Sequence, residues 1–380
     1  MAKPSTIGQL LIIGFDGTKM SPRLASLLTK IQPAGVILFA RNIVGAKQTH
    51  TLLRECQTCV ATPLFTCVDL EGGTVDRFRN VMGSAPSPAE VFATGSRVLF
   101  RKHGRVIGKN CRALGFNVDF APVLDLAYEA SRSVLSSRAV SDDPKQVVAY
   151  AREFLRGLGD AGVLGCGKHF PGLGEATLDT HRELPSVDKT LRNLWEQDLV
   201  PYRSLSLRRE LPFVMVSHAA FPAVTKERIP ASLSKKWITD ILRKKIGYRG
   251  LICSDDLEMG GVLAAASIEQ AAIEQAMIGH IRAGGDLGLI CHQEDFVLRA
   301  HEALIREAER DRKFARRLRE SAGRVLAFKK QVFDKRPAAR RRAPAPTTAR
   351  IEKLTRQLWE FGEEIRLTTL ARRAWDRNRT

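Results

Sequence analysis

The sequence of 380 residues contains no apolar run long enough to cross a bilayer. Its longest runs, such as Leu10–Phe15 and Gly35–Ala40, are far shorter than the roughly 20 residues that a membrane-spanning helix needs. The 7 cysteines are an odd number spread over a long chain, which excludes an ordinary disulfide framework. No stretch has the features of a cleavable signal peptide. We therefore expect a cytoplasmic protein with reduced thiols.

Two kinds of cofactor site are also missing from the sequence. No cluster of His, Cys, Asp or Glu has the spacing of a metal site, so neither a metal nor another cofactor is expected. No G-x-G-x-x-G follows the first predicted strand, which disfavours a doubly wound nucleotide-binding sheet.

Basic charge is in excess, with 60 Lys and Arg against 41 Asp and Glu and a net charge of +19. Residues 335–380 hold 13 of the basic and 5 of the acidic residues, so +8 of the excess lies in the last eighth of the chain. A basic protein invites a nucleic-acid interpretation, but this tail has few aromatic residues and no nucleic-acid motif. It is either a solvated basic tail or a binder of nucleic acid, an anionic membrane surface or an acidic polymer, and nucleic acid is not the partner we expect.

Short apolar, β-branched runs alternate with amphipathic stretches along most of the chain. Continuous apolar runs are typical of strands that are covered on both faces, and eight such strands alternating with helices predict a (β/α)8 barrel of the α/β class. The expected strands are Leu10–Phe15, Gly35–Ala40, Pro63–Asp69, Phe116–Leu126, Val163–Phe170, Phe213–His218, Leu251–Asp255 and Asp286–His292. The expected helices are 45–60, 96–114, 144–160, 190–208, 235–246, 264–283, 294–309 and 311–330.

The character of the chain changes after Phe333. We predict a barrel over residues 1–334, a basic linker rich in Pro and Ala over 335–350, and a helical extension over 351–380. Apolar residues at spacings of three to five predict a helix that docks on the barrel or on a partner: Leu354, Leu358, Phe361, Ile365 and Leu370.

Polar side chains stand at the carboxyl ends of six predicted strands. In a barrel these ends form the face that carries the active site. A polar cap could explain any one of these residues, but not all of them together: Asp69, Asp125, Lys168 with His169, Ser217 with His218, Asp255 with Asp256, and His292.

Four segments carry the chemistry. The strongest is KHFPGLGEATLDTH (Lys168–His181), in which a Gly-rich loop ends in Asp179-x-His181. An aspartate this close can hydrogen-bond one imidazole nitrogen and leave the other for proton transfer. The other three are DLEGGTVDR (Asp69–Arg77), SSRAVSDDP (Ser136–Pro144) and SDDLEM (Ser254–Met259). Because neighbouring strand residues point to opposite sides, only one of Asp255 and Asp256 is expected to face the barrel axis.

In this order, the four segments resemble glycoside hydrolase family 3, and specifically its single-domain bacterial β-N-acetylglucosaminidases. The resemblance covers roughly residues 5–330. It implies that Asp255 is the nucleophile of a retaining glycosidase and that His181, held by Asp179, is its general acid and base. It also implies that the sugar is bound by Asp69, Arg77, Arg138, Lys168 and His169, whose charged groups can exchange hydrogen bonds with hydroxyls.

The implied activity is removal of terminal β-linked N-acetylglucosamine from anhydromuropeptides during recycling of the cell wall. Three departures from the family pattern affect loop contacts and substrate fit: Leu173 replaces a His, Thr180 replaces a Ser, and Ala139-Val140 replaces Ser-Phe. Two other functions stay open. One is a different sugar preference, such as β-glucoside, and the other is a basic-tail binder of anionic polymers with little hydrolase activity.

Overall fold

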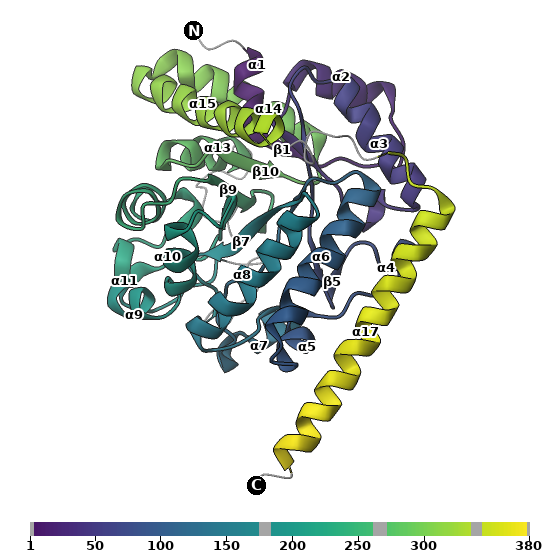
Figure 1. The fold of residues 1–380 in the computed structure, drawn as a ribbon. Helices are drawn as coiled ribbons and strands as arrows, with labels where there is room; N and C mark the ends of the chain where they lie inside the picture. Colours follow the sequence, from purple (N-terminus) through teal and green to yellow (C-terminus); the bar gives the residue numbers. More distant parts are fainter. Residues whose placement is uncertain (1–3, 175–183, 261–271, 336–343, 378–380) are drawn as a thin grey trace.

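The computed structural model describes residues 4–174, 184–260, 272–335 and 344–377. Its centre is a closed barrel of parallel strands in the order β1-β10-β9-β8-β7-β6-β3-β2, which confirms the predicted (β/α)8 class (Figure 1). The barrel strands are β1 Leu11–Ile13, β2 Gly35–Ile37, β3 Phe65–Val68, β6 Val118–Asp119, β7 Leu164–Phe170, β8 Phe213–Val216, β9 Leu251–Asp256 and β10 Leu287–Ile290.

Helices surround the barrel. The longer ones are α2 Pro22–Ile31, α3 Ala46–Thr58, α6 Arg97–Leu114, α8 Pro144–Asp160, α10 Val200–Leu207, the π-helical η6 Lys236–Lys245, α13 Ala272–Ala283, α14 Glu294–Arg310, α15 Arg312–Lys335 and α17 Thr348–Arg377. The short ones are α1 Pro4–Ile7, η1 Gly8–Leu10, η2 Ala40–Asn42, α4 Arg79–Met82, α5 Pro88–Ala93, η3 Glu129–Ser131, α7 Arg132–Leu135, η4 Ser136–Arg138, α9 Leu191–Glu196, α11 Pro222–Thr225 and η5 Ala231–Leu233.

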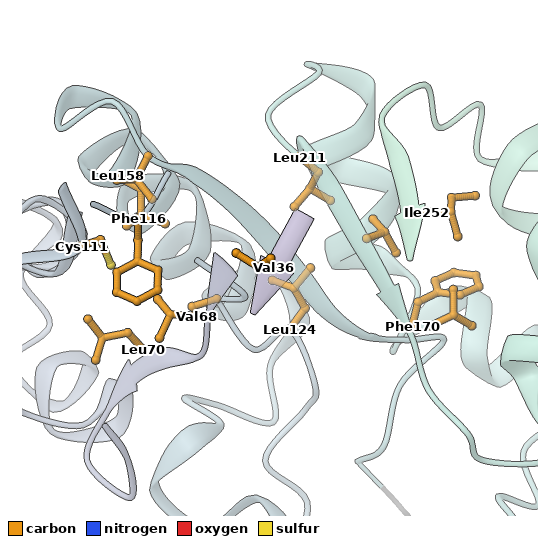
Figure 2. Packing of buried hydrophobic residues seen from close by; sticks show 14 of the residues in the cluster. Val36, Val68, Leu70, Cys111, Phe116, Leu124, Leu158, Phe170, Leu211 and Ile252 are labelled. Atoms are coloured by element: carbon orange, nitrogen blue, oxygen red, sulfur yellow. The ribbon is translucent and has the colours of Figure 1, made fainter. Parts of the chain in front are cut away.

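Alternate residues of each strand pack into two separate apolar layers, because successive side chains point to opposite faces. The inner layer fills the barrel and includes Ile12, Ile37, Phe65, Cys67, Phe213, Met215, Leu251 and Cys253. The outer layer lies between strands and helices and includes Ile13, Val36, Val68, Val214 and Ile252. Figure 2 shows part of this outer layer, with Phe116 lying close to Cys111 and Val68.

Helix α15 closes the end of the barrel at which the strands begin. Its Phe328 makes edge contacts with Phe65 and Phe213, with ring centroids 6.2 and 5.5 Å apart. Val325, Val332 and Phe333 belong to the same inner layer. Apolar side chains therefore fill the barrel interior at this end, while the polar residues that follow the strands lie at the opposite end.

One charged side chain lies inside this plug. Lys329 is 3% exposed, and its Nζ donates to Oε1 of Gln9 at 2.8 Å and to Oγ1 of Thr62 at 3.4 Å. The ammonium lies 5.1 Å from the centre of the Phe65 ring. Burial lowers the pKa of Lys329 to about 7, because no carboxylate among the described residues pairs with it.

We expect Lys329→Met to stabilise the protein at pH 7 by about 2 kcal/mol. The shift of the Lys329 pKa from 10.5 to about 7 costs the folded state up to about 4 kcal/mol at neutral pH. Lys329→Met removes this cost, but it leaves the Gln9 oxygen without its donor, which offsets about 1–3 kcal/mol of the gain. The folded state binds fewer protons than the unfolded state between pH 7 and 10.5, so the penalty disappears as pH rises through this window. Urea unfolding of both proteins from pH 6.5 to 10 should give curves that cross, and parallel curves would contradict the assignment.

Helix α17 spans Thr348–Arg377 and packs on the outside of the barrel along α6, α4 and α5 (Figure 1). Leu354, Leu358, Phe361 and Ile365 are buried, and the Phe361 ring stacks on His103 with centroids 5.8 Å apart. Leu370 was expected in the same stripe but is 49% exposed, because the end of the helix extends past the body of the barrel.

Several elements differ from the prediction. The run Phe116–Leu126 contributes only Val118–Asp119 as a strand, and the expected helix over 190–208 is broken into α9 and α10. Helix α2 and the small hairpin of β4 Leu70–Gly72 and β5 Val75–Asp76 were not predicted. The first part of the helix expected over 264–283 falls outside the described residues. No helix in the described ranges combines the length and apolar character of a membrane span.

Candidate active site

A cavity of about 620 Å³ lies at the carboxyl ends of the barrel strands. Of the predicted site residues, six line it: Asp69, Arg77, Arg138, Lys168, His169 and Asp255. They come from segments up to 186 residues apart and are brought together only by closure of the barrel. Asp179 and His181 lie outside the described residues.

Glu71 is the centre of a buried charge network in this cavity. Its side chain is 1% exposed and accepts two parallel hydrogen bonds from Arg138, each 2.8 Å long. The same carboxylate lies 2.6 Å from Nζ of Lys168, which also donates to Oδ1 of Asp69 at 2.7 Å. Two cations and two carboxylates thus hold one another in fixed positions.

This network keeps its members ionised. Burial would raise the pKa of Glu71, but the adjacent Lys168 and Arg138 outweigh it and hold that pKa well below the usual value. For Lys168, burial acts to lower the pKa, and the carboxylates of Asp69 and Glu71 raise it above the usual value. The cavity therefore presents permanent charges to whatever binds there, and such charges can pair with sugar hydroxyls.

Lys168 and His169 are consecutive residues of β7, joined by a cis peptide bond. His169 Nδ1 lies 2.7 Å from Oδ2 of Asp125. Asp125 also accepts the amide protons of His169 at 3.1 Å and of Leu173 at 2.8 Å. Asp125 therefore fixes both the imidazole and the start of the loop that continues toward residues 175–183.

Asp255 lies near the end of β9 and lines the cavity. Its Oδ1 accepts the amide proton of Asp256 at 2.8 Å. Burial acts to raise the pKa of Asp255, but the nearby imidazoles of His169 and His218 and the Asp256 amide lower it below the usual value. The side chain is therefore a carboxylate at neutral pH, as a nucleophile must be.

His218 anchors the backbone next to Asp255. Its Nε2 lies 2.9 Å from the carbonyl oxygen of Asp256, and its Nδ1 lies 2.7 Å from Oγ of Ser232. A carbonyl oxygen only accepts, so Nε2 carries the proton and Nδ1 accepts from the serine hydroxyl. Burial lowers the pKa of His218, which is consistent with this neutral tautomer.

Arg77 reaches the cavity from the end of the β4–β5 hairpin. Asp76 secures this turn because its carboxylate accepts the amide protons of Phe78 at 3.0 Å and Ala85 at 2.9 Å. The Arg77 guanidinium carbon lies 5.8 Å from the centre of the Phe39 ring. Its buried Nε has no hydrogen-bond partner among the described residues, so it is available to a bound ligand.

The outer wall of the cavity holds a second pair of a histidine and an aspartate. His292 stacks on Phe39 with centroids 5.4 Å apart, and its Nε2 lies 3.4 Å from Oδ2 of Asp256. The Asp256 carboxylate raises the pKa of His292 above its usual value. Asp255 and Asp256 both line the cavity, and the Asp256 carboxylate is directed to His292.

Taken together, the cavity offers an ionised carboxylate at a strand end, surrounded by fixed cations and carboxylates. A family model described as "Glycosyl hydrolase family 3 N terminal domain" matches residues 4–328. The chain belongs to glycosyl hydrolase family 3. The predicted family resemblance is thereby confirmed, and the chain is a glycoside hydrolase.

Curated relatives support the same family. The chain is 34% identical over 291 residues to a β-hexosaminidase of Stenotrophomonas maltophilia, a match that covers 75% of this chain and 84% of that protein. It is 36% identical over 293 residues to a β-hexosaminidase of Alkalilimnicola ehrlichii, covering 76% of this chain and 82% of the relative.

Solved structures of family 3 are similar throughout the barrel. A β-N-acetylglucosaminidase from Paenibacillus sp. str. FPU-7 matches with a TM-score of 0.84 at 31% identity, covering 95% of this chain and 69% of that chain. A family 3 glycosyl hydrolase from Mycobacterium smegmatis matches with a TM-score of 0.76 at 29% identity, covering 86% and 97%. A β-glucoside phosphorylase has a TM-score of 0.82 at 22% identity, which shows a shared fold alone.

Sequence reasoning missed three functional groups of this glycosidase. Glu71 belongs to the segment DLEGGTVDR, but the segment alone does not predict a role for it. The only local signal is its spacing of two residues from Asp69, which is that of neighbours on one face of a strand. Asp125 and His292 were noted only as polar residues at strand ends. Their roles depend on His169 and Asp256, which are distant in sequence, so no local signal identifies them.

Of the departures from the family pattern, those at Leu173, Ala139 and Val140 fall on buried positions, and Thr180 lies outside the described residues. Leu173 is packed in the apolar core cluster and keeps only its amide contact with Asp125. Ala139 and Val140 are also buried. The described residues contain no group of three or more His, Cys, Asp or Glu positioned to hold a metal ion.

Proposed function

We propose that this family 3 glycosidase is a retaining exo-β-N-acetylglucosaminidase that removes terminal β-linked N-acetylglucosamine. The observation that carries the proposal is the Asp255 carboxylate, kept ionised at the end of a barrel strand and facing the Glu71 charge network. The sugar preference is supported by relatives that are named β-hexosaminidases and by the similarity to a β-N-acetylglucosaminidase.

In the proposed first step, an oxygen of Asp255 attacks the anomeric carbon. The bond from that carbon to the leaving oxygen breaks, and this oxygen takes a proton from the general acid. In the second step, water attacks the anomeric carbon of the glycosyl ester. The same residue, now a base, accepts the water proton, and the Asp255 carboxylate is released. Asp69, Arg77, Arg138, Lys168 and His169 hold the sugar.

We assign the general acid and base to His181, oriented by Asp179. Two carboxyl groups of the cavity support this assignment, because Glu71 and Asp255 both have lowered pKa values and are therefore poor proton donors at neutral pH. The motif supports it as well, because Asp179 stands two residues before His181.

The proposed substrates are N-acetylglucosaminyl anhydromuropeptides, released during cytoplasmic recycling of the cell wall. Such an aglycone carries carboxylates. Arg77 lines the cavity beside Phe39, with its guanidinium carbon 5.8 Å from the ring centre. A cation at this wall would attract an acidic aglycone more strongly than a neutral one.

The proposal is tested by comparing hydrolysis of an aryl β-N-acetylglucosaminide with that of the matching aryl β-glucoside. We expect kcat/KM to be at least about 100-fold higher for the N-acetylated sugar, since a site built to hydrogen-bond a substrate group rejects the analogue that lacks it. Equal rates, or faster cleavage of the glucoside, would support the β-glucosidase alternative instead. Formation of a glycosyl phosphate in the presence of inorganic phosphate would identify a phosphorylase.

The acid and base assignment has a matched control within the chain. His181→Ala should lower kcat by about 10²–10⁴-fold on a substrate with a poor leaving group, and much less on an aryl substrate that needs no protonation. His292→Ala removes a histidine that is paired with an aspartate at the outer wall of this cavity, and we expect less than a tenfold change. If His292→Ala shows the larger, leaving-group-dependent loss, the roles are reversed.

The division into a barrel over 1–334, a linker over 335–350 and an extension over 351–380 remains a proposal, as does a binding role for the basic tail. Salt-dependent binding of nucleic acid to the full chain and to a chain that ends at residue 334 would test that role. Equal affinity of both chains would exclude the tail as the binding element.

A further inference from the structure

A second cavity, of about 560 Å³, lies at the end of the barrel opposite the catalytic one. It is bounded by the end of α10, the residues that precede β8 and β9, and the last turns of α15. This volume is within the range of small-molecule sites. Its lining residues are Leu164, Ser206, Arg209, Leu211, Pro212, Tyr248, Arg249, Gly250, Phe328, Gln331 and Val332.

Ser206 gives this cavity an unsatisfied polar group. The residue is 9% exposed, and its buried Oγ has no hydrogen-bond partner among the described residues. A buried hydroxyl without a hydrogen-bond partner is unfavourable. Since Ser206 lines the cavity, a molecule bound there could supply the missing partner.

Two arginines give the cavity its charge. Arg209 and Arg249 both line it and are exposed, and neither has an ion pair or side-chain hydrogen bond among the described residues. No Asp or Glu occurs among the described lining residues. The nearest carboxylate along the chain, Glu210, is already bound to Arg152 at 2.8 Å. The net positive charge of the cavity is therefore not neutralised from within.

The backbone at Arg209 is unusual for a side chain of this kind. The residue adopts a left-handed conformation with φ of 54°, where the chain leaves α10 and the amide of Glu210 bonds back to the carbonyl of Leu205 at 3.0 Å. Glycine is the usual residue at this position of a helix end, and a larger residue costs roughly 1 kcal/mol there. The left-handed backbone makes glycine a well-tolerated replacement at this position.

The rest of the cavity is apolar and partly aromatic. Phe328 is half-buried and lies among Leu164, Leu211 and Val332. Two cations beside such a surface match a ligand with a doubly charged anionic group joined to a flat aromatic ring. Guanidinium groups bind phosphate with paired hydrogen bonds, and phosphate monoesters carry close to two charges at neutral pH.

We propose that this cavity binds an organic phosphate monoester that carries a flat aromatic ring, such as a nucleoside monophosphate. Arg209 and Arg249 bind the phosphate, Ser206 donates to it or to the adjoining ring, and Phe328 contacts the aromatic ring. The site is separate from the glycosidase centre, because it is formed where the strands begin and the catalytic cavity is formed where they end.

The test is isothermal titration calorimetry of the full chain at low salt with uridine monophosphate, adenosine monophosphate, inorganic phosphate and uridine. We expect at least one nucleotide to bind about tenfold or more tightly than either inorganic phosphate or uridine. Arg209→Ala and Arg249→Ala should each weaken binding by about tenfold or more, and Ser206→Ala by a smaller factor. Arg208→Ala removes the same charge from an exposed neighbour outside the lining and should change the affinity less than twofold.

A further variant separates binding from folding. Arg209→Gly suits the left-handed backbone, so it should unfold at a temperature no lower than the wild type while losing nucleotide affinity. Hydrolysis of an aryl substrate should be unchanged in all four arginine variants. The proposal is overturned if no nucleotide binds, if inorganic phosphate binds as tightly as the nucleotides, or if Arg208→Ala weakens binding as much as Arg209→Ala does.

Discussion

Asp255→Asn is expected to lower kcat by at least about 10³-fold, the order lost when an activated nucleophile is removed. The amide has the same shape and still accepts the Asp256 amide proton that Asp255 accepts at 2.8 Å, but it cannot form the glycosyl ester. Substrate affinity should change little, since the charge network around Glu71 does not depend on Asp255. Steady-state kinetics with an aryl β-N-acetylglucosaminide measures both parameters.

Asp256→Asn is the matched control for this prediction. Asp256 is the neighbouring carboxylate of β9 and lines the same cavity, but its Oδ1 accepts the Glu258 amide proton at 3.1 Å and its Oδ2 faces His292. We expect less than a tenfold loss of kcat. The assignment of Asp255 as the nucleophile is wrong if Asp256→Asn loses as much kcat as Asp255→Asn. It is also wrong if Asp255→Asn keeps a tenth of wild-type turnover.

Azide distinguishes the proposed nucleophile from the proposed acid and base by the stereochemistry of its product. In Asp255→Gly, azide can attack from the face that the carboxylate occupied and give the α-glycosyl azide. In His181→Ala, azide attacks the glycosyl ester and gives the β-glycosyl azide. The outcomes are opposite because Asp255→Gly allows one displacement at the anomeric carbon and His181→Ala allows two. Nuclear magnetic resonance of the products tells the two azides apart.

Glu71→Gln is expected to lower the free energy of unfolding by about 3 kcal/mol at pH 7, because it leaves buried cations with too few partners. Arg138 loses its paired carboxylate, and Lys168 keeps only Asp69. We also expect a drop of about 100-fold in kcat/KM, since these two cations would no longer be held in place. Urea unfolding and steady-state kinetics measure the two effects.

The effect of Glu71→Gln on stability should depend on pH in a defined direction. Burial opposes ionisation of Glu71, but Lys168 and Arg138 hold its pKa well below the usual 4.5. Because the pKa of Glu71 is lower in the folded state, its ionised form stabilises the protein above pH 4.5. This stabilisation is lost as the pH falls below that value. The difference between wild type and Glu71→Gln should therefore shrink from pH 7 to pH 3.

The exposed pair of Glu129 and Arg132 provides the control for the Glu71 experiment. Their side chains are 3.0 Å apart and 81% and 77% exposed. Glu129→Gln should change the free energy of unfolding by less than about 1 kcal/mol. If Glu71→Gln has an equally small effect, the network does not support the fold.

The barrel could be predicted because its pattern is local. Each strand is a short apolar run and each is followed by an amphipathic stretch, so the number and order of the strands can be read without tertiary information. The breaks could not be predicted in the same way. The helix expected over 190–208 stops after Glu196 and resumes at Val200, and the long run from Phe116 contributes only two residues to the barrel. Both outcomes depend on neighbouring elements.

The site residues also fall into those that local motifs predict and those that depend on tertiary contacts. Asp69, Arg77, Arg138, Lys168, His169 and Asp255 could be chosen from motifs, and the structure places all of them on one cavity. The central position of Glu71 could not be predicted, since it results from Arg138, which is 67 residues away in sequence. The exposure of Leu370 was also unpredictable from its spacing, because it depends on how far α17 extends beyond α6.

The sequence by itself determined the strand and helix order of a family 3 barrel and the residue types that a glycosidase needs, because periodicity and motifs are properties of neighbouring residues. Only the tertiary structure decided which carboxylates are ionised, since the lowered pKa values of Glu71 and Asp255 come largely from groups that are distant in sequence. It also decided that Arg209, Arg249 and Ser206 share a cavity. Burial and charge pairing are set by distance in space, which sequence order does not contain.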